Sequence, residues 1–192
     1  MLTALSLAEL QPGTRSIARF SLIADTEKKA ANVFKTALER LSNADNWNMF
    51  CGNADVVHWH TDDHAEPVHK PLKQGDYLCA TTNSAEENPK AEQTLIHVEK
   101  IETHLNPCAE WEALAITIKY SSDVEETSGE FPETFTTVLL QRDKRTVKVE
   151  IYEKTDAIRA NSPEQTKLVK DHASIEASPD KWEQLAKLVL SQ

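Results

Sequence analysis

The hydrophobic positions of this chain recur with two periods, one typical of helices and one typical of strands. Residues 27–41 place apolar side chains three and four positions apart, which predicts an amphipathic helix with Ala30 and Phe34 on its buried side. Asp25 or Thr26 immediately precedes this segment and is a candidate N-terminal cap.

Helical patterns also appear after this first helix and at the end of the chain. A short helix is predicted over 44–51, with two aromatic residues turned inward. A stripe of apolar residues predicts a helix over about 163–175, and Ser178-Pro179-Asp180 is a start signal for a last helix.

Strand-like alternation occupies most of the remaining chain. The predicted strands cover 16–24, 54–60, 77–82, 95–105, 111–120, 134–142 and 145–152, the last two joined by a tight turn at Asp143-Lys144. Meander connections of this kind give an antiparallel sheet with one face that needs cover, and only the helices can supply it. The fold class is therefore predicted to be α+β.

Composition and charge narrow the function classes. A chain of 192 residues with 40% hydrophobic residues suits a single globular domain. Its formal net charge of −10 and lack of basic runs argue against nucleic acid and against anionic membranes as partners. Three widely spaced cysteines and no CxxC pair favour reduced thiols, so we expect a cytoplasmic protein.

The first fifteen residues are interpreted as an N-terminal arm, and residues 16–192 as one domain. The arm is apolar, but it has no positively charged start and Glu9 interrupts it, so it does not match a signal peptide. We expect it to dock through its leucines. Elsewhere no apolar run approaches the roughly 20 residues needed to span a bilayer, so integral membrane association is not expected.

The predicted order is strand, helix, helix, six strands, helix, and it resembles the helix-grip fold of the START-like (SRPBCC) superfamily of polyketide cyclase/dehydrase-type and lipid-transport domains. The stretch 31–57, "ANVFKTALERLSNADNWNMFCGNADVV", is similar to the first helix, short helix and second strand of that family. The stretch 67–78, "PVHKPLKQGDYL", is similar to the next loop and turn. Two features depart from the family pattern: the extra arm, and Ser178-Pro179, which splits the C-terminal helix.

The resemblance implies a curved seven-stranded antiparallel sheet wrapped on the C-terminal helix, with a cavity for a small hydrophobic or amphipathic ligand between them. It implies no cofactor. The candidate ligand-binding residues are Trp47, Phe50, His58, Ile116, Ile118, Tyr120, His172 and Trp182. The alternative is that these side chains only pack the core.

A second hypothesis comes from the histidine-rich stretch 57–69, "VHWHTDDHAEPVH". On a strand, His58 and His60 project from one face about 7 Å apart, a separation that lets two imidazoles share one metal ion. Asp62 or His64 would complete the site of a metal-dependent hydrolase. His58, His60 and Asp62 match the HxHxDH pattern of metallo-β-lactamases, but Asp63 replaces the next histidine.

A third hypothesis is an interaction module such as a chaperone cofactor. No GxSxG, P-loop or GxGxxG motif is present, and no catalytic residue is assigned. The preferred function is binding of a small apolar or amphipathic molecule. Its identity, any reaction and the oligomeric state are left open by the sequence.

Overall fold

A computed structural model describes residues 14–43, 47, 55–59, 71–81, 93–106, 111–122, 134–155 and 179–191. The predicted helix over 163–175 lies outside these residues, as does the predicted short helix over 44–51 apart from Trp47. The elements are β1 (Thr14–Ile23), α2 (Glu27–Ser42), β2 (Asp55–Trp59), β3 (Tyr77–Thr81), β4 (Gln93–His104), β5 (Trp111–Ser122), β6 (Thr134–Asp143), β7 (Thr146–Thr155) and α4 (Pro179–Leu190).

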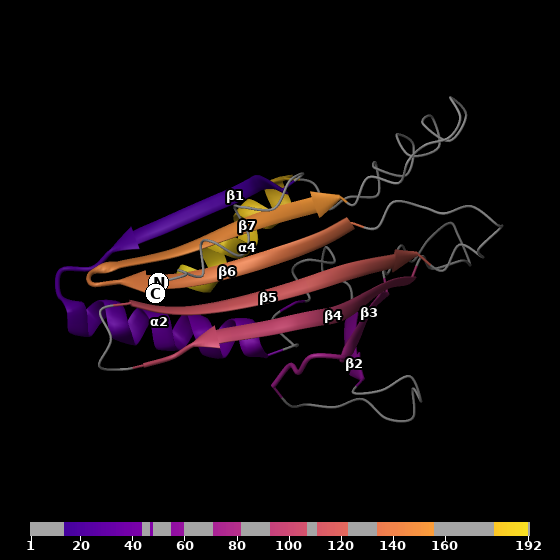
Figure 1. Ribbon diagram of the computed structural model, residues 1–192, viewed down its shortest axis with the longest axis horizontal. Coiled ribbons are helices and arrows are strands. Elements are labelled where there is room, and N and C mark those ends of the chain that lie inside the picture. Colours follow the sequence, from indigo (N-terminus) through magenta and orange to yellow (C-terminus); the bar gives the residue numbers. More distant parts are fainter. Residues whose placement is uncertain are drawn as a thin grey trace.

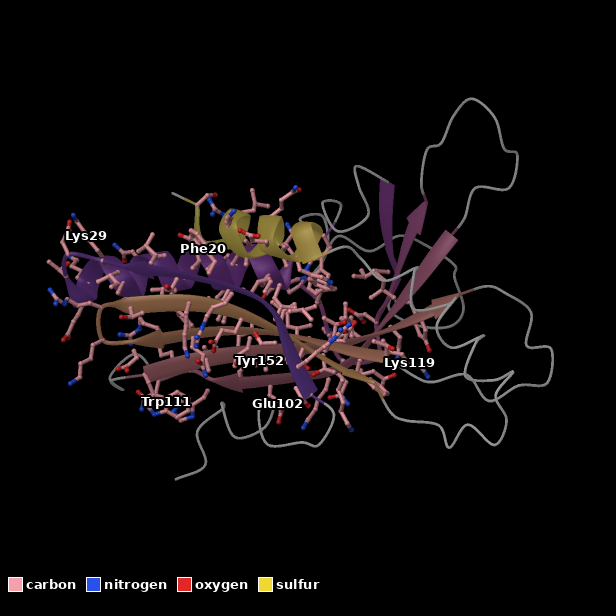
Figure 2. The ribbon with its side chains drawn as sticks, turned by 90° about the horizontal axis from the view of Figure 1, so that it is seen from above. Phe20, Lys29, Glu102, Trp111, Lys119 and Tyr152 are labelled. Atoms are coloured by element: carbon pink, nitrogen blue, oxygen red, sulfur yellow. The ribbon has the colours of Figure 1, made fainter. Side chains whose placement is uncertain are left out.

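Within the described residues the strands form one seven-stranded antiparallel sheet in the order β1-β7-β6-β5-β4-β3-β2 (Figure 1). Strands β2 to β7 follow one another as a meander, and β1 joins the far side by pairing with β7. Both helices lie on the same side of the sheet, and β2 and β3 bend toward that side (Figure 2). The predicted α+β class is confirmed. We call the helix side the inner face and the other side the outer face.

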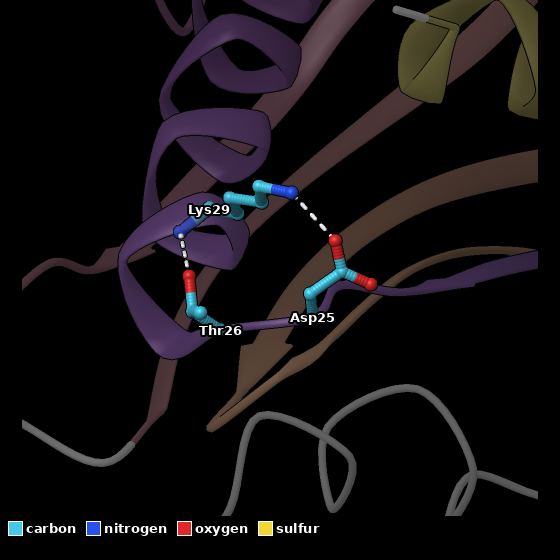
Figure 3. A network of polar contacts seen from close by, with 3 residues as sticks. All are labelled: Asp25, Thr26 and Lys29. Carbon is cyan, nitrogen blue, oxygen red and sulfur yellow. Dashed lines mark hydrogen bonds and ion pairs between the residues drawn. The ribbon is translucent and has the colours of Figure 1, made fainter.

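Helix α2 has the boundaries and the buried stripe that the sequence predicts. Thr26 is its N-cap, and the Thr26 Oγ1 accepts a hydrogen bond of 3.2 Å from the backbone N–H of Lys29 (Figure 3). Phe34 and three other apolar residues of the stripe are buried. Because a cap satisfies one of the otherwise unpaired N–H groups, it fixes where the helix begins after β1.

The hydrophobic core lies between the inner face and the two helices. Alternate residues of β5, β6 and β7 point into it, as the period of two in their sequences predicts. Helix α4 packs against β1, β7 and α2, and α2 also packs against β6 and β7. The helices therefore cover chiefly the β1-β7-β6 side of the sheet.

The β6–β7 hairpin turns one residue later than predicted. Asp143 pairs with Thr146, so the two turn residues are Lys144 and Arg145 rather than Asp143 and Lys144. Lys144 takes a φ of 50°, in the left-handed region. A two-residue hairpin requires a positive φ at its first turn position, and here a lysine supplies it.

A candidate ligand-binding interior

Four of the predicted ligand-binding residues lie together in one buried apolar cluster. Ile116 and Ile118 occupy the inner face of β5, where they pair with Val138 and Thr136 of β6. Trp47 and Trp182 are buried in the same cluster from the helical side. The sequence therefore identified side chains that share one interior, although they come from three separate parts of the chain.

Trp47 is held in place by a hydrogen bond as well as by packing. Its indole Nε1 donates to the backbone carbonyl of Leu41, in the last turn of α2, at 2.9 Å. A buried indole N–H needs such a partner, because leaving it unpaired costs free energy. The bond satisfies a helix-terminal carbonyl and orients the ring at the same time.

The buried apolar surface continues beyond the area that the helices cover. Ile96 and Val98 on β4, and Leu78 on β3, are no more than 1% exposed, yet α2 and α4 pack chiefly on β1, β6 and β7. Strand β3 and the part of β4 that pairs with it belong to the bent end of the sheet (Figure 2). The interior is therefore apolar on both the helix-covered and the bent part of the inner face.

A row of three polar residues, Thr136, Glu153 and Arg15, borders this apolar surface, and we call it the polar row. In register across the inner face lie Ile118 of β5, Thr136 of β6, Glu153 of β7 and Arg15 of β1. Thr136 and Glu153 are buried, and the Arg15 Nε donates to the Glu153 Oε2 at 2.6 Å. The sequence does not predict this pair, because its members are 138 positions apart and only the β1–β7 register brings them together.

Helix α4 is fastened at its C-terminal end by Arg40 of α2. The Arg40 Nη1 donates to the carbonyls of Leu188 at 3.0 Å and Val189 at 3.2 Å, and it also contacts Ser191. The last carbonyls of a helix lack internal partners and carry partial negative charge, so a guanidinium is a suitable counterpart. The ends of the two helices are thereby locked together.

The remaining predicted site residues lie outside the described residues or are placed by their strand alone. Phe50 and His172 lie outside the described residues, as do His60, Asp62 and His64 of the predicted metal site. His58 and Tyr120 are placed only by their strands: His58 pairs with Leu78 and Tyr120 with Ile96. In the part of the chain that the structure describes, no group of three or more candidate metal ligands occurs.

Two other histidines make contacts that the sequence did not indicate. His97 Nδ1 lies 2.8 Å from the Glu99 Oε1, next to the irregularity in the β4–β5 pairing. His104 stacks on Trp111, with ring centroids 3.8 Å apart and ring planes 8° from parallel. Each contact ties β4 side chains in place, and neither forms part of a catalytic arrangement among the described residues.

Comparison with known proteins gives only distant likenesses. No protein-family model matches the chain, and no curated protein matches it. Similar solved structures include Ara h 8.0201 (14% identity, 94% of this chain and 100% of that one, TM-score 0.41). Protein CV1439 from Chromobacterium violaceum has the same identity and coverage, with a TM-score of 0.37.

A START superfamily protein from Mycobacterium smegmatis is also among these structures, at 8% identity over 92% of this chain and 98% of that one, with a TM-score of 0.30. This chain thus has a distant likeness to a structure of the superfamily that its sequence resembles. Within the described residues no helix is long and apolar enough to cross a membrane.

Proposed function

We propose that this protein binds a small apolar or amphipathic molecule between the inner face of the sheet and α4. The observation that carries the proposal is the apolar cluster that α4 shares with the inner face, in which Trp182 of α4 is buried together with Ile116 and Ile118 of β5. Ligand sites of this class are concave, mostly apolar and lined by a few polar groups that fix orientation.

The bend of the sheet supports the location. Because β2 and β3 turn toward the helix side (Figure 2), the inner face curves at the end of the sheet to which β3 and β4 contribute the buried residues Leu78 and Ile96. Trp47, which is bonded to the last turn of α2, belongs to the same buried cluster as these residues. An apolar guest placed here would be removed from water on several sides, which is the main source of favourable free energy in such binding.

The polar row gives the proposed ligand an orientation. Thr136, Glu153 and Arg15 follow Ile118 across the sheet, so the apolar surface ends at a hydroxyl and a charged pair. A ligand with one polar end would place it against this row and its apolar part against Ile118 and Ile116. We therefore propose an amphipathic molecule in preference to a pure hydrocarbon.

Binding is tested with a fluorescent apolar probe, 1-anilinonaphthalene-8-sulfonate, on the purified full chain, together with native mass spectrometry for a co-purified small molecule. Ile118→Trp adds volume at a buried inner-face position and is expected to weaken probe binding at least tenfold. Ile23→Trp adds the same ring at a residue that is 75% exposed and is the matched control, expected to bind as the wild type does.

Circular dichroism melts establish that both variants are folded. If Ile118→Trp does not fold, Ile118→Ala provides the opposite change, because it enlarges the interior and should admit bulkier probes. Equal binding by the Ile118 and Ile23 variants would contradict the proposed location. No co-purified molecule and no saturable probe binding by the wild type would reject ligand binding itself.

The metal-dependent hydrolase and the interaction module stay hypotheses from the sequence. Three of the four candidate ligands of the metal site lie outside the described residues, and His58 is placed only by its position on the edge strand β2. No contact of the described residues favours either function over ligand binding.

A further inference from the structure

The outer face of the sheet carries a stripe of side chains that are almost inaccessible, although both helices lie on the other side. Leu139 is 1% exposed, Glu150 2% and Tyr152 5%, and Gln141 and Ala113 are also buried. The three apolar members are not part of the inner cluster. Glu150 forms ion pairs with Arg19 and Lys148, whose side chains account for part of its burial. For the other four residues, something other than the core keeps water away.

The strand register shows that these residues form one oblique line. Tyr152 and Glu150 lie on β7, Leu139 is opposite Glu150 on β6, and Gln141 on β6 is opposite Ala113 on β5. The line begins at Tyr152 on β7, which pairs with Ser16 near the start of β1. It crosses β6 and ends at Ala113 on β5, at the end of the sheet where the β6–β7 hairpin turns. We call these five residues the outer stripe.

Positions beside the outer stripe are more accessible than positions on it. Thr137 on β6, Ala115 on β5 and Lys148 on β7 are each only partly buried, although they are direct neighbours of stripe residues. A neighbouring alanine or threonine is too short to cover a leucine on an open sheet face. A narrow segment crossing the strands at an angle explains this pattern, whereas a broad cover would bury the neighbours equally.

We propose that residues 1–13 are this segment and that they dock along the outer stripe. The first reason is chemical: seven of these thirteen residues are apolar and only Glu9 is charged. Residues 123–133, by contrast, contain five acidic residues among eleven. Residues 156–178 have to connect β7 to α4, which packs on the inner face.

The second reason is where the segment starts and how far it reaches. Residue 13 leads into Thr14, which pairs with Lys154 on β7, two positions from Tyr152 at the beginning of the stripe. Thirteen residues span up to about 43 Å when extended. Crossing from β1 to β5 requires only about 15 Å, at roughly 4.8 Å for each step between strands. The arm can therefore follow the whole stripe.

The third reason is an unsatisfied polar atom on the stripe. The Gln141 Oε1 is buried and has no hydrogen-bond partner that the structure records. A buried amide oxygen without a partner is costly, so a donor is expected beside it. Backbone N–H groups of an extended arm, or the hydroxyls of Thr3 and Ser6, are donors of the right kind.

Docking is tested in the full chain with a photo-crosslinking residue. Leu7→p-benzoylphenylalanine is expected to give intramolecular crosslinks that peptide mapping places on β5, β6 or β7 at outer-face positions. Ile23→p-benzoylphenylalanine, at an exposed residue, is the control for random crosslinking and should not label the stripe. Crosslinks from residue 7 to α2, α4 or a second molecule would overturn the proposal.

Hydroxyl-radical footprinting provides a second readout that needs no photoprobe. In the wild type, Tyr152 and Leu139 are expected to be protected, and Leu5→Asp combined with Leu7→Asp should raise their labelling at least threefold. Labelling of inner-face Ile116 should not change, which separates undocking from unfolding. Ile23→Asp is the control with an added charge on an exposed site. Unchanged protection of Tyr152 in the folded double variant would overturn the proposal.

Discussion

Arg142 of β6 and Glu112 of β5 form an ion pair on the inner face of the sheet, where the two residues lie opposite each other. The Arg142 Nε lies 2.8 Å from the Glu112 Oε2, and the side chains are only 6% and 11% exposed. They follow directly on the apolar pair Leu114–Leu140 along the same face. Such a pair is costly to desolvate, so its value depends on both partners being present.

Removing one partner should therefore be much worse than removing both. Arg142→Met is expected to lower the free energy of unfolding by about 3–5 kcal/mol, because it leaves the Glu112 carboxylate buried without its cation. The double variant Glu112→Leu/Arg142→Met should recover most of that loss. Urea unfolding followed by circular dichroism measures both, and a double variant as unstable as Arg142→Met would contradict this account.

Arg40 links the ends of the two helices, and its loss should loosen α4. Arg40→Met keeps the aliphatic stem but removes the bonds to the carbonyls of Leu188 and Val189. We expect a loss of about 1–2 kcal/mol in unfolding free energy, together with faster amide hydrogen exchange in the last turn of α4. Lys35→Met, on the exposed side of α2, is the control and should change stability by less than about 0.5 kcal/mol.

Asp25 should titrate below its ordinary range. A hydrogen bond from the Lys29 side chain, at 2.5 Å (Figure 3), and the charge of that lysine lower the pKa of Asp25 from 3.8. The charge of Arg145 contributes further to this lowering. A lowered pKa in the folded state adds stability above pH 3.8 that disappears as the pH falls through the folded value.

Asp25→Asn removes this contribution and leaves the Thr26 cap in place. The stability difference from the wild type should be small, be present at neutral pH and vanish in acid. Because the carboxylate is exposed, salt should also reduce this stability difference. NMR titration of the Asp25 carboxyl carbon checks the shift directly, and a pKa at or above 3.8 would contradict it.

The β6–β7 turn offers a stabilising substitution. Lys144 has a φ of 50°, which a glycine adopts without strain, so Lys144→Gly is expected to raise the unfolding free energy by about 0.5–1 kcal/mol. Arg145→Gly at the next position is the matched control, because Arg145 does not have a positive φ and glycine there should be neutral or destabilising. Thermal melts of both variants compare their stabilities. A Lys144→Gly variant less stable than Arg145→Gly would contradict the assignment of the turn.

Patterns within single elements were read correctly from the sequence. The alternation of Leu114, Ile116 and Ile118 predicted the inner face of β5, and the Thr26 cap and apolar stripe predicted α2. Such features depend on the local period of hydrophobic residues and on the residue at the helix end. Both can be recognised within a short stretch of sequence.

Features that depend on register were not predicted. The pairing of Arg15 with Glu153 requires β1 to lie beside β7, and no local pattern specifies that neighbour. The burial of Glu150 was also missed, because alternation placed it on the polar side of β7. One signal was available: Val138, Leu139 and Leu140 are consecutive apolar residues, which indicates a strand covered on both faces.

The place of β1 in the sheet also affects how the chain is made. Strand β1 is translated first, yet its partner is β7, and the Arg15–Glu153 pair joins residues 138 positions apart. The edge of β1 that pairs with β7 therefore stays unpaired until β7 has left the ribosome. Long-range closure of this kind slows folding, and an exposed edge invites pairing with other chains. We therefore expect newly synthesised molecules to depend on chaperone protection more than the mature protein does.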